Sequence, residues 1–404
     1  MTQPQLFVGI DVGCHKHSVA IADSVDFLEE FEITHDTTGF QYFFSRISFL
    51  SKKFKLPVVI GMEGTSGYAR PLDQMILIRG YKLLNINNYK LARFKEIFPS
   101  PAKTDAIDVQ KIVMFIKLAP SMDPKKDVLQ QVGAMLEKNQ FLKRLSRRRR
   151  QLVNEKIVVQ NRIQSDLQAV SPGFLDFLKI DSLYVLRFIC CRSDIRQLAN
   201  IRLTSLMNLE GIGKTYAQKL LLWQKNALFS AEAEYVGPMI IEDAERLLDL
   251  HSKIHALEKQ MEKLLEQSHL GKTISSIIGF GTVCAAEIAG EIGTVTRFNS
   301  EAGLAIYLGM APLDRSSGKQ VGTKDPVQVN KRAKAAMMTG AAHNARNVDE
   351  SKIYYQKKIS EGKKHNQALR SLGRHLVRVI WSLIKNNKLY DVKKRNECNL
   401  EGAA

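Results

Sequence analysis

The first quarter of the chain alternates between short apolar runs and amphipathic stretches, and this alternation limits its fold more than any other feature. Period and composition predict strands at residues 6–10, 17–22, 27–34, 56–62 and 82–86. The same reasoning predicts helices at residues 37–50, 68–79 and 105–118. Strands that alternate with helices indicate an α/β domain.

The order of these elements narrows the α/β class. Two strands come first and are joined by a glycine-containing turn, a third follows, and strand–helix units come after them. An antiparallel hairpin followed by strand–helix units is the order of the ribonuclease H-like fold. We therefore expect that fold at the N-terminus.

Four carboxylates lie at the ends of these predicted elements. Asp11 ends the first apolar run, and Glu63 ends the run before a Gly-Thr-Ser-Gly turn. Asp105 and Asp108 are three residues apart, so they face the same way on a helix that Thr104 can cap. Carboxylate oxygens suit Mg²⁺, and two such ions stabilise both the attacking and the leaving oxygen of a phosphoryl transfer. The four acids predict a two-metal site that acts on phosphodiesters.

Two alternatives compete with this interpretation. Most acids are simply solvated, but four of them in order at element boundaries favour a site. The segment Val8–Gly13 also resembles the first phosphate loop of actin-like sugar kinases and ATPases. Those enzymes need a second Asp-x-Gly loop and a Gly-rich adenosine loop, and neither occurs in a convincing context. The sequence favours the nuclease-like site.

The positive charge of the chain lies outside this acidic module. The net charge is +18, which points to a polyanionic partner such as nucleic acid. Residues 134–163 carry 9 Lys/Arg against 2 Asp/Glu, and residues 315–397 carry 20 against 6. The acids and the surfaces that grip a polyanion are therefore expected in different parts of the chain.

The rest of the 404-residue chain has mostly helical patterns. A long basic helix is predicted over 134–169, residues 174–235 are less regular, and another helix is predicted over 242–268. In the last helix apolar residues step by three and four, as in a heptad seam: Leu247, Leu250, Ile254, Leu257, Met261 and Leu264. The seam fits a short coiled coil, between chains or against the basic helix, or a packed amphipathic helix. We expect three domains, over 1–130, 131–272 and 273–404.

Two Gly-apolar-Gly segments, at 211–213 and 279–281, each precede a predicted helix. They resemble the turn of a helix-hairpin-helix motif, whose backbone N–H groups can bind a phosphate. A tight helix–helix turn without a ligand is the alternative for each.

Several common features of other protein classes are missing from the sequence. The five cysteines show neither CxxC pairing nor zinc-ligand spacing, and the N-terminus has no signal-peptide pattern. No apolar run approaches the ~20 residues needed to cross a bilayer. We expect a cytoplasmic protein with reduced thiols and no membrane partner.

A series of motifs together resembles one protein family. The series comprises Gly-Ile-Asp at 9–11, Glu-Gly-Thr-Ser-Gly-Tyr at 63–68, Lys-Thr-Asp-Ala-Ile-Asp at 103–108, the basic helix, Gly279–Gly281, Arg297-Phe298 and Pro312–Gly318. Motifs in this order are typical of the DEDD transposases of bacterial insertion sequences (the IS-one-ten type, which includes the Piv DNA invertases). The chain resembles this family over most of its length.

This resemblance implies roles for single residues. Asp11, Glu63, Asp105 and Asp108 match the metal-binding DEDD set, which would hold two Mg²⁺ ions. Ser317 matches the proposed nucleophile, although Ser316 is adjacent and only spacing distinguishes the two. The family also implies a RuvC-like N-terminal domain, a mostly α C-terminal transposase domain, recombination through a four-way junction and a guide RNA from the element.

Ten basic residues are expected to contact nucleic acid. Four consecutive arginines span more than a helical turn, so they cannot all point into a core. The expected contacts are Lys143, Arg144, Arg147, Arg148, Arg149 and Arg150 on the basic helix, and Arg315, Lys319, Lys331 and Arg332 around the serine. Because aromatic residues are sparse in both stretches, duplex DNA or structured RNA fits better than a single strand.

The expected function is therefore that of a DNA transposase that cuts and rejoins strands as a homo-oligomer, either a dimer or a tetramer. A phosphoserine link at Ser317 would conserve the energy of the broken bond. The alternatives are a site-specific DNA invertase of the same family, a Holliday-junction-type nuclease that uses water, and a non-catalytic nucleic-acid-binding protein. Residues 174–235 have no functional interpretation at this stage.

Overall fold

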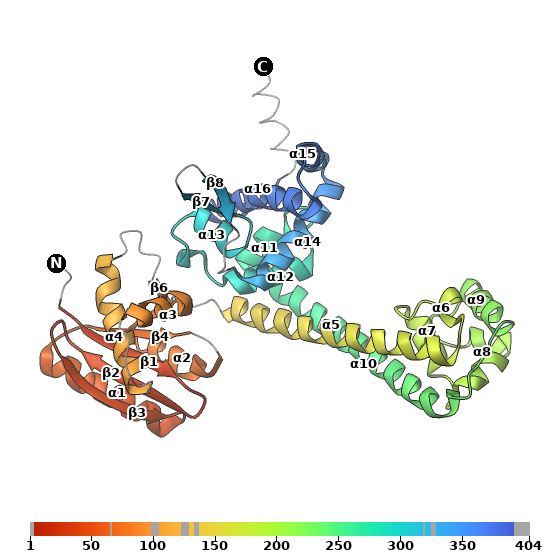
Figure 1. Ribbon diagram of the computed structural model, residues 1–404, viewed down its shortest axis with the longest axis horizontal. Helices are drawn as coiled ribbons and strands as arrows, with labels where there is room; N and C mark the ends of the chain where they lie inside the picture. The colour runs from red at the N-terminus through yellow and green to blue at the C-terminus, as the bar shows by residue number, and fades with distance from the viewer. Residues whose placement is uncertain are drawn as a thin grey trace, which may run out of the picture. The chain divides into compact units, whose positions relative to one another are not determined.

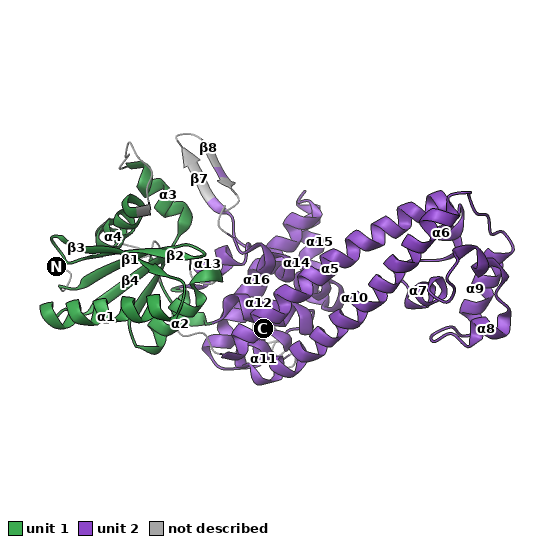
Figure 2. Ribbon diagram, turned by 90° about the horizontal axis from the view of Figure 1, so that it is seen from below, with its two compact units in different colours: residues 1–135, 294–299 green, residues 136–293, 300–404 purple. Residues whose placement is uncertain are grey.

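The protein is described by a computed structural model in which the chain forms two compact units (Figures 1 and 2). The first unit comprises residues 1–135 and 294–299, and the second comprises 136–293 and 300–404. The structure describes residues 4–64, 67–97, 105–122, 129–132, 137–317, 320–324 and 329–391. The second unit contains most of residues 131–404, whereas 131–135 and 294–299 belong to the first.

A mixed sheet forms the centre of the first unit. Its strands, within the described residues, are β1 (Leu6–Val12), β2 (Lys16–Ala22), β3 (Phe27–Thr34), β4 (Val58–Glu63), β5 (Lys82–Ile86) and β6 (Leu129–Gln131). They are arranged in the order β3-β2-β1-β4-β5-β6. β1, β4 and β5 are parallel, whereas β2, β3 and β6 pair antiparallel with their neighbours. The strands predicted from the sequence are confirmed, and β6 was not predicted.

Helices cover both faces of this sheet. The helices of the first unit are α1 (Thr37–Phe54), α2 (Arg70–Ile78), α3 (Asn88–Ile97) and α4 (Asp105–Met122). Alternate residues of β1 face opposite ways, so Val8 packs in one core with α1 and α2, and Phe7 packs in another with α3 and α4. The three predicted helices are confirmed within a few residues at their ends, and α3 was not predicted.

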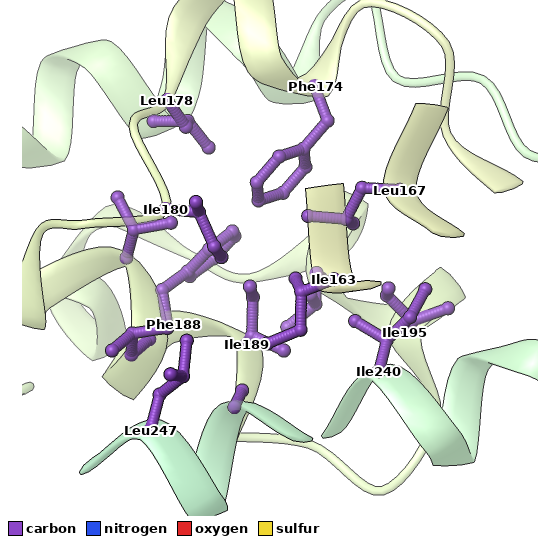
Figure 3. Packing of buried hydrophobic residues seen from close by; sticks show 14 of the residues in the cluster. Ile163, Leu167, Phe174, Leu178, Ile180, Phe188, Ile189, Ile195, Ile240 and Leu247 are labelled. Carbon is purple, nitrogen blue, oxygen red and sulfur yellow. The ribbon is translucent and has the colours of Figure 1, made fainter. Parts of the chain in front are cut away.

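Two long helices dominate the second unit. The basic helix α5 (Glu137–Val170) and α10 (Ala233–Gln267) run side by side (Figure 1). They are antiparallel, because Arg149 of α5 pairs with Glu258 and Glu155 pairs with Arg246. At the far end of the pair, Ile163 and Leu167 of α5 and Ile240 and Leu247 of α10 enclose one apolar core (Figure 3).

The predicted seam of α10 is largely buried. Leu247, Leu250, Ile254 and Met261 are buried, and Leu257 is partly so. Beyond Met261 the buried residue is Leu265 rather than Leu264, since a helix of 3.6 residues per turn drifts from a strict heptad. The helix packs on α5 of the same chain, and a coiled coil remains a prediction.

Residues between the long helices form a cap of short helices. These are α6 (Phe174–Phe177), α7 (Leu183–Ile189), the 3₁₀ turn η2 (Ile195–Asn200), α8 (Leu203–Met207) and α9 (Lys214–Gln224). Trp223 lies at the centre of their core and makes edge contacts with Phe174 and Phe188. The short helices agree with the irregular pattern of this segment.

The C-terminal part of the second unit is mostly helical, as predicted. Its elements are α11 (His269–Ser275), α12 (Thr282–Ile292), η3 (Val295–Arg297, which lies in the first unit), α13 (Glu301–Tyr307), β7 (Leu313–Ser317), β8 (Gln320–Lys324), α14 (Lys331–Asn347), α15 (Asp349–Ser360) and α16 (His365–Lys385). The hairpin of β7 and β8 was not predicted. Among the residues that the structure describes, no helix has the length and apolar character to cross a membrane.

Candidate active site

Asp11 and Glu63 lie at equivalent positions on two adjacent strands. β1 and β4 are parallel, and Ile10 is paired with Met62. Asp11 and Glu63, which follow these two residues, therefore lie next to each other on the two strands. Successive side chains of a strand alternate between faces, which places both acids on the face that α4 covers. The sheet alone therefore brings these two carboxylates together.

Two glycines allow the helix that carries the other acids to approach the sheet closely. Gly9 and Gly61 are paired in the ladder, on the same face as the acids. A Cβ on Gly9 would lie 2.7 Å from Cγ2 of Val113 and 3.1 Å from the carbonyl oxygen of Val109, and one on Gly61 would meet Ile116. α4 thus packs against bare backbone, and Asp108 precedes the first of these contact residues.

Lys95 of α3 connects two of the acids. Its Nζ lies 3.3 Å from Oδ2 of Asp108 and 3.6 Å from Oε2 of Glu63. The three side chains are only 18–28% exposed, so the ammonium group is held in a partly desolvated position. Sequence reasoning did not identify this residue, because it lies on a helix that the pattern did not predict.

The position of Lys95 tests whether the acids suit a metal ion. A single cation is shared by Glu63 and Asp108, so their oxygens converge on one positively charged position. Two carboxylates with room for water and phosphate oxygens suit Mg²⁺. Within the described side chains no three possible ligands form a metal cluster. Asp105 begins α4, but its side chain lies outside what the structure describes.

Ser317, the predicted nucleophile, ends strand β7. The backbone register pairs Ser316 with Val321 and Ser317 with Gln320, so Ser317 forms the last pair of this ladder. Lys319 and the side chains of Arg315, Ser316 and Ser317 lie outside the described residues. The structure thus places the serine backbone in the second unit and the acids in the first.

Three of the four consecutive arginines form ion pairs within the chain. Arg147 and Arg150 each make two hydrogen bonds to a glutamate of α12, at 2.7 and 2.9 Å to Glu291 and at 2.8 and 2.5 Å to Glu287. Arg149 pairs with Glu258 at 2.6 Å. These arginines hold helices together, because bidentate pairs fix both position and orientation.

Glu287 and Glu291 are the residues that sequence reasoning missed here. Both are buried, at 3% and 0% exposure, in an otherwise apolar helix. Burial would raise the pKa of Glu291, but hydrogen bonds from Arg147 and Asn330 hold it below its usual range. Two acids four residues apart in an apolar helix were a usable signal, since buried charges need partners.

The remaining basic residues have more exposed positions. Arg144 and Arg148 are exposed on α5, and Lys143 is half-buried. Lys331 and Arg332 are exposed in the first turn of α14, whose N-cap is Asn330. Among the described residues expected to contact nucleic acid, Arg144, Arg148, Lys331 and Arg332 are therefore exposed.

The two Gly-apolar-Gly turns differ in their surroundings. Gly279 has a φ of +99°, and a Cβ there would lie 2.6–2.9 Å from backbone atoms of α14. That turn is therefore a close helix–helix contact. Gly211 has a φ of +80°, and a Cβ there would lie 3.0 Å from Nη1 at the end of the Arg187 side chain. The first turn lies at an open surface.

Two family models of known proteins match the chain, one over its N-terminal part and one over its C-terminal part. A family model of the DEDD type, described as a transposase, matches residues 8–172, and one described as the transposase IS116/IS110/IS902 family matches residues 271–356. The first match includes Asp11, Glu63, Asp105 and Asp108, and the second includes Ser317.

Three curated proteins of insertion elements are similar to the chain. An uncharacterised 43.6 kDa protein of element IS110 from Streptomyces coelicolor is 26% identical, over 96% of this chain and 95% of its own length. A 44.8 kDa protein of IS116 from Streptomyces clavuligerus is 22% identical, over 96% of each. A 42 kDa protein of IS900 from Mycobacterium paratuberculosis is 30% identical, over 36% of this chain and 37% of its own length.

Proposed function

We propose that this chain, which belongs to the IS110 family of insertion-element transposases, cuts and rejoins DNA with four acids as metal ligands and a serine as nucleophile. The acids are Asp11, Glu63, Asp105 and Asp108, and the serine is Ser317. One observation carries the proposal. Asp11 and Glu63 lie near the carboxyl ends of adjacent parallel strands, and Asp108 shares one cation with Glu63.

The sheet order supports a RuvC-like, ribonuclease H-like fold for the first unit. Its central strand β1 pairs antiparallel with β2 on one side and parallel with β4 on the other. The hairpin and the strand–helix units thus meet at the strand that carries Asp11. Asp11 and Glu63 thus lie on the face of the sheet that is covered by α4, the helix that carries Asp108.

The protein's own contribution to the acidic site is rigid placement of its ligands. The β ladder fixes Asp11 and Glu63, and the close packing of α4 on Gly9 and Gly61 fixes Asp108. Ligands on strands and helices are positioned more precisely than ligands on loops. Magnesium ions bound there would polarise the scissile phosphate and stabilise the leaving oxygen.

Ser317 would make the reaction an exchange rather than a hydrolysis. A serine hydroxyl is a weak nucleophile until it is activated. Attack of its Oγ on phosphorus forms a phosphoserine ester as the bond from phosphorus to the neighbouring nucleotide oxygen breaks, and the serine proton passes to solvent. Attack by a strand hydroxyl on that ester then rejoins DNA without an external energy source.

The partners that we propose follow from the same chemistry. DNA is the substrate, and a guide RNA from the element selects target and donor. Two strands at each of two sites require more than one serine, which favours a dimer or tetramer. Exposure favours Arg144, Arg148, Lys331 and Arg332 as phosphate contacts, whereas Arg147, Arg149 and Arg150 form ion pairs within the chain. Lys143, Arg315 and Lys319 stay among the proposed contacts.

Replacement of Lys95 by Gln is expected to increase the affinity for divalent cations about tenfold, or about 1.4 kcal/mol. The ammonium group neutralises Glu63 and Asp108, so a divalent ion must compete with it for the same oxygens. The measurement is isothermal titration of the protein with MnCl₂ in the absence of DNA. Lys90→Gln, on the same helix, is the control. Unchanged or weaker binding by Lys95→Gln would contradict this role.

The proposed function is tested by cutting of labelled duplex that carries the end of the element. The reaction contains the full chain, the adjoining RNA and Mg²⁺. We expect cutting by the wild-type protein and its loss when a single acid of the set is replaced by its amide. Binding without cutting under every condition would show a nucleic-acid-binding protein instead.

A further inference from the structure

The cap of short helices contains a pocket of about 490 Å³ that the proposed chemistry does not use. Its lining comes from the segments around α7 and α9, at the far end of the long helices (Figure 1). Aromatic and basic side chains share this lining: Phe177, Lys179, Tyr184, Arg187, Tyr216 and Lys219. Such a combination is typical of sites that hold unpaired nucleotides.

Two stacked tyrosines form the aromatic part of the pocket. The rings of Tyr184 and Tyr216 have centroids 4.2 Å apart and an angle of 21° between their planes. Tyr184 is half-buried, whereas Tyr216 is 42% exposed. Burial, with Tyr216 and Asp181 nearby, raises the pKa of Tyr184, so its hydroxyl stays protonated and can donate a hydrogen bond. A supported ring with an exposed surface offers a stacking platform to a planar base.

Basic groups surround this platform. Lys179 and Lys219 are exposed, and neither forms an ion pair with another residue that the structure describes. Arg187 is held in place by Glu210, through a hydrogen bond of 3.1 Å to its carbonyl oxygen and a 3.0 Å contact with its carboxylate. The pocket thus presents two mobile cations and one oriented guanidinium group, which suits a backbone phosphate.

The glycine turn at 211–213 borders the pocket. Gly211 lines the pocket and takes a positive φ, which a residue with a side chain rarely adopts. The following turn residue, Ile212, is buried, and Gly213 caps α9. The equivalent turn at 279–281 is closed by α14. The first turn therefore borders this pocket, whereas Gly279 of the second turn packs against α14.

We propose that this pocket binds a nucleotide of single-stranded nucleic acid, with the base stacked on the Tyr184–Tyr216 pair and the phosphate held by Lys179 and Lys219. This assigns a role to residues 174–235. It also adds to the expectation that duplex or structured nucleic acid fits the two basic stretches better than a single strand, since the aromatic platform lies outside those stretches. The site does not involve the four acids or Ser317, so its test is independent of strand cutting.

The test uses the full-length chain and decanucleotides that carry one 5-iodouracil, a base that crosslinks on irradiation to an aromatic ring stacked on it. Ribose and deoxyribose versions show which nucleic acid is the source. Peptide mapping should place the crosslink on Tyr216 or Tyr184 for at least one of them. Crosslinks confined to other residues would overturn the proposal.

Affinity measurements complete the test. Tyr216→Ala should weaken binding of the decanucleotide that crosslinks about tenfold, since the base would lose its aromatic stacking partner. Tyr216→Phe keeps the ring and should stay within about twofold, and Tyr235→Ala, at a 73% exposed tyrosine outside the pocket, is the matched control. Duplex binding should not change. Equal affinity of Tyr216→Ala and wild type for both single strands, or an equal loss for duplex, would overturn the proposal.

Discussion

Asp108→Asn is expected to lower the rate of strand cutting by about a thousandfold or more, because metal ions contribute several kcal/mol of transition-state stabilisation. An amide keeps the shape of the side chain but removes the charge that Asp108 contributes beside Glu63 and Lys95. DNA affinity should stay within about twofold of wild type, since a single acid contributes little to the grip of a chain with a net charge of +18.

The matched control is Asp26→Asn, an identical chemical change at an exposed loop residue of the same unit. Cutting of end-labelled DNA is followed on a denaturing gel, and affinity is followed by fluorescence anisotropy. Cutting by Asp108→Asn at the wild-type rate would show that Asp108 is not part of the active site. A parallel loss of affinity would mean that the acid supports binding instead of chemistry.

Arg147→Ala is expected to lower the free energy of unfolding of the second unit by about 2–3 kcal/mol at pH 7. It leaves Glu291, which is fully buried, without its bidentate partner. The expected cost is at the low end for a broken buried pair, because Arg147 is 35% exposed and Asn330 still donates to Glu291. Arg148→Ala, at the exposed neighbour, should change stability by less than about 0.5 kcal/mol.

Urea unfolding followed by tryptophan fluorescence measures this effect, since Trp223 and Trp381 both lie in the second unit. The pKa of Glu291 is lower in the folded protein than in the unfolded chain. Its ion pair therefore stabilises the fold at any pH above the unfolded-state pKa, and this stabilisation is lost as the pH falls through the folded-state pKa. The difference between wild type and Arg147→Ala should therefore shrink in acid. Equal destabilisation by Arg147→Ala and Arg148→Ala would contradict the assignment.

The adjacent placement of Asp11 and Glu63 could be predicted from local sequence, because it follows from local rules. Asp11 and Glu63 each end an apolar run, and the spacing of Asp105 and Asp108 fits one helical face. Parallel pairing of the two strands then brings Asp11 and Glu63 together without further information. Gly9 and Gly61 were visible in those runs, but the close packing of α4 on them was not.

Long-range partners could not be predicted in the same way. Lys95 and Asp108 come together through α3, which the sequence pattern did not distinguish from a loop. The arginines of α5 all look equivalent in the sequence, and only the approach of α12 separates Arg147 and Arg150 from Arg148. A charged run predicts a charged surface, but the partners of each charge depend on tertiary packing.

The hairpin around Ser317 was missed for a related reason. β7 and β8 are five residues each and mostly polar, so neither shows the apolar alternation by which strands are recognised. Their pairing still defines a backbone position for Ser317 at the end of the ladder. The serine was identified through family resemblance, and its chemical role rests on the proposal made above.

The most direct measurement of the central claim is a search for a covalent link between the protein and DNA. Labelled element-end duplex is incubated with the full chain, the adjoining RNA and Mg²⁺, and the products are denatured and separated. We predict a protein–DNA adduct that persists in Ser316→Ala and disappears in Ser317→Ala. Strand cutting that continues at the wild-type rate in Ser317→Ala, without an adduct, would contradict the account and indicate hydrolysis by water.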